Sequence, residues 1–77
     1  MMMSMDSHEV LRCQRGDEIR IYNIRTVSTG AQLWRVTEVA GEPARSIKEC
    51  DLADPDEALE FLEEVRRALK AGGWQEL

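Results

Sequence analysis

Apolar and polar residues alternate along the first two thirds of the chain, which is the pattern of half-buried strands. Stretches rich in Gly, Ser and Pro separate the alternating segments, which cover residues 9–14, 18–27, 32–40 and 43–50. The stretch "GE" at 41–42 predicts a two-residue hairpin with Gly41 at positive φ. Connections this short make neighbouring strands antiparallel, so we expect a four-stranded antiparallel β-meander.

After residue 50 the apolar positions recur every three or four residues, as in an amphipathic helix. Asp54 is placed as its N-cap, Pro55 as its first residue, and Gly72 as the left-handed residue that ends it. The apolar stripe comprises Ala58, Leu62, Val65 and Leu69, flanked by Leu59, Phe61 and Ala68. We expect this stripe to pack on one sheet face, with Trp74 folded back over the edge of the helix–sheet core.

The expected fold is therefore α+β, with the C-terminal helix packed on one face of the sheet. We expect residues 1–7 to be a disordered segment and residues 8–77 to form a single β-β-β-β-α domain. A chain of this size buries only about 60% of its unfolded surface, so it commonly needs a partner, a metal or a disulfide. The residues expected in the core are Leu11, Ile19, Ile21, Val36, Ile47, Ala58, Leu62, Val65 and Leu69.

The segment 18–27 carries large apolar residues on both of its faces, which one helix cannot cover. Ile19 and Ile21 lie on one face of this strand, and Tyr22 and Ile24 lie on the other. Three explanations are open. A β-bulge near Tyr22 or Asn23 turns the apolar residues to one side, a second copy of the chain covers the free face, or a ligand or peptide docks there. The next strand repeats the pattern, with Trp34 and Val36 opposite Leu33 and Val39.

Charge is unevenly distributed along the chain. Residues 1–50 hold seven basic and seven acidic side chains, so the net charge of −5 arises entirely within residues 51–77. This acidic balance disfavours general attraction to nucleic acid or anionic lipid. The sequence shows no secretory signal and no apolar run of membrane-spanning length. We therefore expect a cytoplasmic protein in which Cys13 and Cys50 are thiols.

Residues that carry chemistry are few. His8, Cys13 and Cys50 lack the paired short spacings of a zinc site. The acidic run from Asp51 to Glu57 lacks the glycine of a calcium loop and is explained by helix capping. The chain has one histidine and no nucleophile motif. We expect no enzyme activity, no metal and no cofactor.

Arginines and aromatic residues occur together in the sheet half, a combination that single-stranded nucleic acid binders use. The order of four strands and a C-terminal helix resembles that of the single-strand-binding transcription coactivators, which also pair as dimers. No residue motif accompanies this order, so we infer no binding residues from it.

The possible interaction face comprises Arg20, Tyr22, Ile24, Trp34 and Arg35. We predict a homodimeric binding or regulatory module whose partner is a second copy or another protein. The alternative is single-stranded nucleic acid binding through this Arg/aromatic face.

Overall fold

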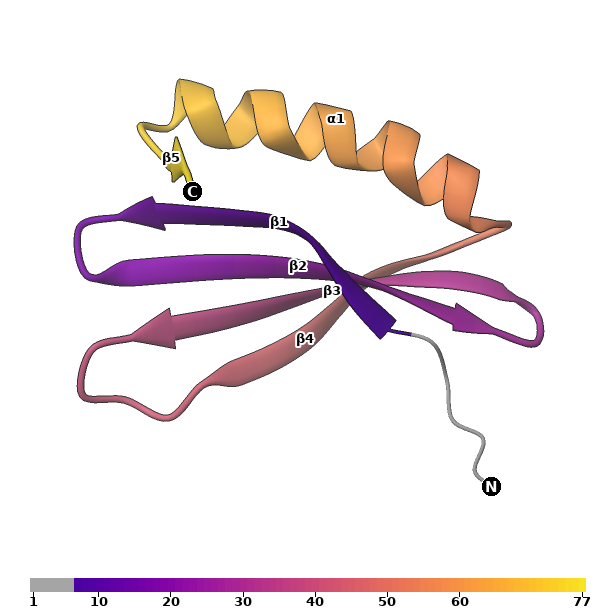
Figure 1. Cartoon of the computed structure of the whole chain (residues 1–77), viewed down its shortest axis with the longest axis horizontal. Helices are drawn as coiled ribbons and strands as arrows, with labels where there is room; N and C mark the ends of the chain where they lie inside the picture. The colour runs from indigo at the N-terminus through magenta and orange to yellow at the C-terminus, as the bar shows by residue number, and fades with distance from the viewer. Residues whose placement is uncertain (1–6) are drawn as a thin grey trace.

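One antiparallel sheet and one helix make up the computed structural model, which describes residues 7–77 (Figure 1). The strand order is β4-β3-β2-β1-β5, and α1 lies against one face of the sheet. The elements are β1 (Ser7–Arg15), β2 (Glu18–Val27), β3 (Gly30–Val39), β4 (Arg45–Leu52), α1 (Pro55–Ala71) and β5 (Gln75–Glu76). The predicted α+β fold is confirmed, and β5 is an addition to it.

Several strand boundaries differ from the sequence-based expectation, and β2 alone matches it at both ends. Ser7 already belongs to β1, whereas the rest of the segment expected to be disordered lies outside the described residues. The predicted two-residue hairpin at 41–42 is wrong, because β3 ends at Val39 and β4 begins only at Arg45. Gly41 does adopt a φ of 82°, in a turn closed by the Glu42 N–H, which donates to the Val39 carbonyl at 3.0 Å.

The start of α1 follows from its capping residues. The Asp54 carboxylate accepts from the Glu57 N–H at 2.8 Å, and Pro55 occupies the first turn, where no N–H is needed. The Glu57 carboxylate reaches back to the Ala53 N–H at 3.0 Å. The predicted N-terminus of the helix is therefore confirmed, together with the chemistry expected to set it.

The end of α1 differs from its prediction by one residue. Gly72 has a φ of −87° and Gly73 a φ of 88°, so Gly73 is the left-handed residue. The Trp74 N–H donates to the Leu69 carbonyl at 3.0 Å and the Gly73 N–H to the Lys70 carbonyl at 3.1 Å. This pair of bonds is the Schellman motif, which places Trp74 against Leu69.

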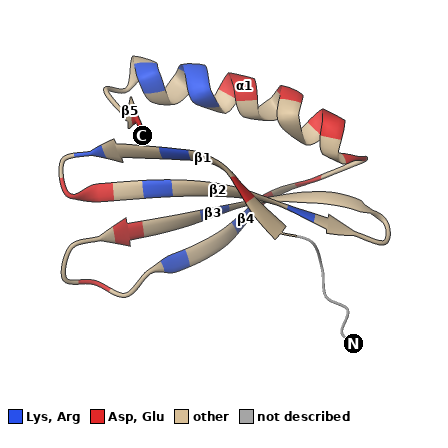
Figure 2. Cartoon of the chain, viewed as in Figure 1, with Lys and Arg blue, Asp and Glu red and all other residues tan. Residues whose placement is uncertain are grey.

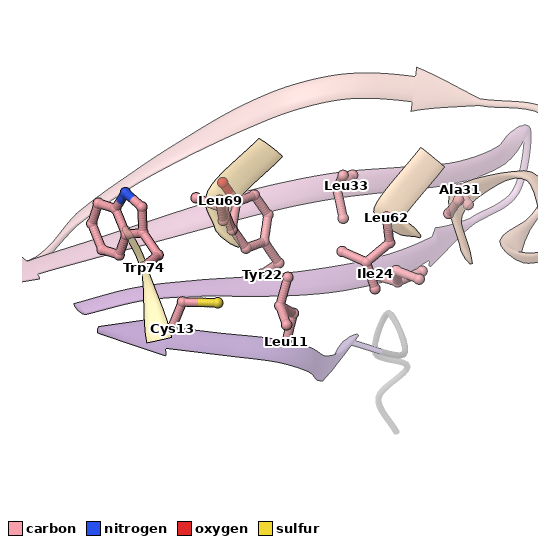
Figure 3. Close-up of a cluster of buried hydrophobic side chains, with 10 residues drawn as sticks. Leu11, Cys13, Tyr22, Ile24, Ala31, Leu33, Leu62, Leu69 and Trp74 are labelled. Carbon is pink, nitrogen blue, oxygen red and sulfur yellow. The ribbon is translucent and has the colours of Figure 1, made fainter. Parts of the chain in front are cut away.

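The hydrophobic core lies between α1 and the sheet (Figure 3). Ile24, Leu33 and Leu62 are its largest fully buried side chains. The complete cluster is Leu11, Cys13, Tyr22, Ile24, Ala31, Leu33, Ala58, Leu62, Leu69 and Trp74. The prediction is confirmed for Leu11, Ala58, Leu62 and Leu69, and Val65 packs against the cluster while partly buried. The core therefore uses the Tyr22 and Ile24 face of β2.

Three other residues predicted for this core, Ile19, Ile21 and Val36, lie on the face opposite α1. The pairing of β2 with β3 runs without a break from Glu18 to Val27, so alternate residues of β2 point to alternate faces. Ile47 is also outside the core and is 50% exposed. It lies in the β3–β4 hairpin, the part of the sheet farthest from α1 (Figure 1).

Two β-bulges occur among residues 7–77, and neither lies in β2. Val10 is the extra residue in β1, opposite the step from Asn23 to Tyr22, and Glu49 is the extra residue in β4. The alternation of β2 is unaffected by both. The explanation that a bulge near Tyr22 or Asn23 turns all the apolar residues to one side is therefore wrong.

Trp74 folds back onto the core as predicted and is only 6% exposed. The guanidinium groups of Arg15 and Arg20 lie over its ring, 4.7 and 4.4 Å from the centroid. Arg15 also donates to the Gly72 carbonyl at 3.0 Å, and the Leu77 N–H donates to the Arg12 carbonyl at 2.8 Å. The C-terminus is thereby attached to β1.

Replacing Trp74→Ala is expected to lower the free energy of unfolding by about 3–5 kcal/mol, the usual cost of truncating a buried Trp. Because a single core of this size supplies only about 3–5 kcal/mol, the variant should be largely unfolded at room temperature. Urea denaturation followed by circular dichroism measures the loss. Leu77→Ala is the matched control, since Leu77 is 61% exposed; a loss below about 1 kcal/mol for Trp74→Ala contradicts its role in the core.

Candidate interaction face

The sheet face opposite α1, here called the outer face, is built from four rows of residues paired across the strands. The rows follow from the register and are Gln14–Ile19–Glu38, Arg12–Ile21–Val36–Ser46, Glu9–Asn23–Trp34–Lys48 and Ser7–Arg25–Gln32–Asp51. No helix or strand of residues 7–77 lies over this face. It is therefore the surface on which the unexplained apolar residues of β2 and β3 lie.

Four apolar side chains, Ile19, Ile21, Trp34 and Val36, lie on the outer face along β2 and β3, with β1 and β4 on either side. Ile21 is 7% exposed yet does not belong to the cluster beneath α1, so it is buried by its neighbours on the outer face. The other three are half-buried. Removing such a contiguous apolar group from water is the main source of free energy in association.

Trp34 is held by two polar neighbours. The Arg25 guanidinium lies 4.5 Å from the centroid of its ring, and the indole N–H donates to the Gln32 side-chain oxygen at 2.9 Å. The ring is therefore oriented by its surroundings, and part of it is already occupied by a cation.

The charges of the outer face cancel. Three acids and three bases belong to its rows, namely Glu9, Glu38, Asp51, Arg12, Arg25 and Lys48. Arg12 pairs with Glu9 at 2.9 Å, and Lys48 pairs with Asp51 at 3.0 Å. The hydrogen bond from Arg12 lowers the pKa of the Glu9 carboxyl. The outer face is thus neutral on a chain whose net charge is −5.

The acidic excess is concentrated elsewhere. Acidic residues lie along the first part of α1, and basic residues lie towards its end (Figure 2). This arrangement suits the positive N-terminal and negative C-terminal ends of the helix dipole. The helix side of the molecule is therefore the acidic side.

The residues of the predicted interaction face do not share one surface. Tyr22 and Ile24 are 3% and 1% exposed beneath α1, and Arg20 stacks on Trp74 on the same side. Arg35 also belongs to the helix side, where it lies 3.4 Å from Glu49, and its buried Nε has no hydrogen-bond partner among the described residues. Trp34 alone is on the outer face.

The sequence-based prediction of this face therefore omitted its other apolar residues, Ile19, Ile21 and Val36, and Arg25, which lies over the Trp34 ring. The signal that could have found them is their shared parity with Trp34 across β2 and β3. The sequence shows this alternation, but it does not show which of the two sets of alternating residues lies beneath the helix.

The cysteines are free and show no sign of activation. Burial raises the pKa of both thiols above the ordinary value. The nearby Arg66 and Lys70 lower the pKa of Cys13 by less than burial raises it. Cys13 lies in β1 and Cys50 in β4, with two strands between them, too far apart for a disulfide. Both are therefore protonated at neutral pH.

No group of three or more metal-ligating side chains gathers among residues 7–77. The same residues form no detectable pocket or cavity. Within this range, no helix has the length and apolar character needed to cross a membrane.

Comparison with known protein families, with curated proteins and with solved structures found no match for this chain. The resemblance in element order therefore gains no support, and the outer face is the feature of this chain that points to a function.

The raised thiol pKa values predict a loss of stability at alkaline pH. A thiol whose pKa is raised by folding binds its proton more tightly in the folded state. Its contribution to the free energy of unfolding is therefore complete below the unfolded pKa of 9.0 and is lost as the pH rises through the folded pKa. The free energy of unfolding should therefore fall as the pH rises above the unfolded thiol value of 9.0, as measured with urea. The Cys13→Ala/Cys50→Ala variant should show a smaller fall; an equal fall would assign the effect to other groups.

Proposed function

We propose that this chain is a small, non-enzymatic interaction module that forms a homodimer through its outer face. The observation that carries the proposal is the uncovered apolar group of Ile19, Ile21, Trp34 and Val36 on that face. A single core this small commonly needs a partner for stability, and two-fold dimers are the most frequent assembly. The free thiols of Cys13 and Cys50 suit the reducing cytoplasm as the place where it works.

The size of the outer face suits a dimer. Its four strands have 8 to 10 residues each. With strands about 4.8 Å apart and a rise of about 3.3 Å per residue, the face measures roughly 600 Å² in plan. Side-chain relief adds accessible area to this figure, which brings it close to the about 800 Å² per partner of a standard interface.

Its charge also favours a second copy over a nucleic acid. Equal numbers of acids and bases give the face no net attraction for phosphates, which normally supply much of the affinity for nucleic acid. Trp34, the aromatic residue of this face, already carries Arg25 on its ring. A neutral surface with an apolar centre can instead meet its own copy without net charge repulsion.

Pairing through a sheet edge is less well supported. β4 is the long free edge, and it carries the Glu49 bulge and Lys48, both of which hinder addition of another strand. The opposite edge is β5, which has only two residues. The outer face is therefore the better surface for self-association.

Wild-type protein is expected to sediment as a dimer at micromolar concentration. Trp34→Glu places a charge in the middle of the interface of both chains, so the dimer dissociation constant should rise at least about a hundredfold. Sedimentation velocity over a concentration series measures it.

Ile47→Glu is the matched control, because Ile47 is 50% exposed but lies on the helix side. This variant introduces the same charge and should leave the dimer intact. A monomeric wild-type protein, or equal dissociation by the two variants, would refute the proposal.

A labelled single-stranded oligonucleotide separates this function from the alternative. We expect no retention of the oligonucleotide at about 50 mM salt, where electrostatic binding is strong. Retention that weakens with added salt and is lost in Trp34→Glu would favour nucleic acid binding instead.

A further inference from the structure

We infer that the two chains of this dimer are related by a two-fold axis that runs across the strands, between the two outer faces. Arg25 of each chain then approaches Glu38 of the other. The inference rests on the proposed homodimer and specifies how its two copies are paired. Its basis is the order of the four rows on the outer face.

Side-chain size is the first argument. The two middle rows differ in height: Trp34 lies in one of them, between Asn23 and Lys48, whereas Val36 and Ser46 are neighbours in the other. A two-fold axis across the strands exchanges these rows, so that the Trp34 ring of each chain lies over Val36 and Ser46 of the other. A self-complementary contact requires such a match of a tall row with a short one.

Charge is the second argument. Arg25 and Glu38 lie in the outermost rows, at opposite ends of the outer face. An axis along the strands would lay each row on its own copy, bringing Arg25 near Arg25 and Glu38 near Glu38. An axis across the strands exchanges the end rows and replaces both like-charge contacts with opposite-charge contacts, which is the favourable arrangement.

The remaining charges are consistent with this axis. Arg12 and Glu9 lie in the two middle rows of β1, so exchanging those rows places each of them over its opposite on the other chain. Asp51, which shares the row of Arg25, is neutralised by Lys48 at 3.0 Å. Among residues 7–77, Arg25 and Glu38 form no ion pair within 4.0 Å; Arg25 lies over the Trp34 ring of its own chain, and neither side chain has an oppositely charged partner there.

Charge reversal tests the inference. Arg25→Glu and Glu38→Arg each create two like-charge contacts per dimer, so each single variant should raise the dimer dissociation constant about tenfold. The Arg25→Glu/Glu38→Arg double variant restores opposite charges at both contacts and should return to within about threefold of the wild-type value. Sedimentation equilibrium measures all four proteins, and circular dichroism confirms that each is folded.

Arg25→Gln distinguishes the two axes by the sign of its effect. For an axis across the strands it removes an attraction and weakens the dimer; for an axis along the strands it removes a repulsion and strengthens it. Unchanged affinity in the two single reversals, or a stronger dimer with Arg25→Gln, would overturn the inference.

A second pair of reversals controls for overall charge. Glu64→Arg and Arg67→Glu change the net charge equally, but both residues are exposed on α1. They should leave the dimer affinity unchanged; an effect equal to that of the outer-face variants would overturn the inference. A wild-type monomer would instead refute the proposed dimer itself, so the two failures are distinguishable.

Discussion

A single helix can cover only one face of a sheet, and this limit determines the rest of the molecule. The covered face holds Tyr22, Ile24 and Leu33, which are 3%, 1% and 0% exposed. The other face holds Ile21 and Trp34 among polar neighbours, and no element of the described residues lies over it. Because β2 and β3 pair without a break, the backbone does not turn these side chains inward. The surface that remains open is therefore a direct consequence of the fold.

The C-terminus attaches the far end of the helix to the edge of the sheet. The Schellman motif brings Trp74 back beneath the end of α1, and β5 then pairs with β1. Arg66 of α1 forms an ion pair with Glu76 of β5 at 3.1 Å, which links the helix to β5. These contacts hold the far end of α1 near β1, whereas its start follows directly from β4. The helix therefore crosses the sheet and leaves Ile47, at the β3–β4 hairpin, exposed.

Local chemistry made most of the fold predictable from the sequence, whereas the choice of face is a property of the whole molecule. Asp54 and Pro55 identify the helix start because capping acts within one turn, and alternation identifies β2 over its full length. The two apolar parities of β2 are nearly equal in hydrophobicity, so Ile19 and Ile21 were predicted for the core that Tyr22 and Ile24 form. The polar residues of β2 do not decide between them, because Arg20 shares the parity of Tyr22 whereas Asn23 and Arg25 share the parity of Ile21.

The distribution of charge is compatible with the proposed pairing of two chains through this open face. The outer face is neutral, and the excess of acids lies on the opposite side with α1 (Figure 2). When two outer faces meet, both sheets separate the two acidic helices, so the repulsion between chains of net charge −5 acts over the longest distance the molecule allows. Any arrangement that brought α1 of one chain towards α1 of the other would bring the acids together. In the proposed dimer, the apolar group would supply the attraction, and the position of the acids would determine which sides of the two chains can approach.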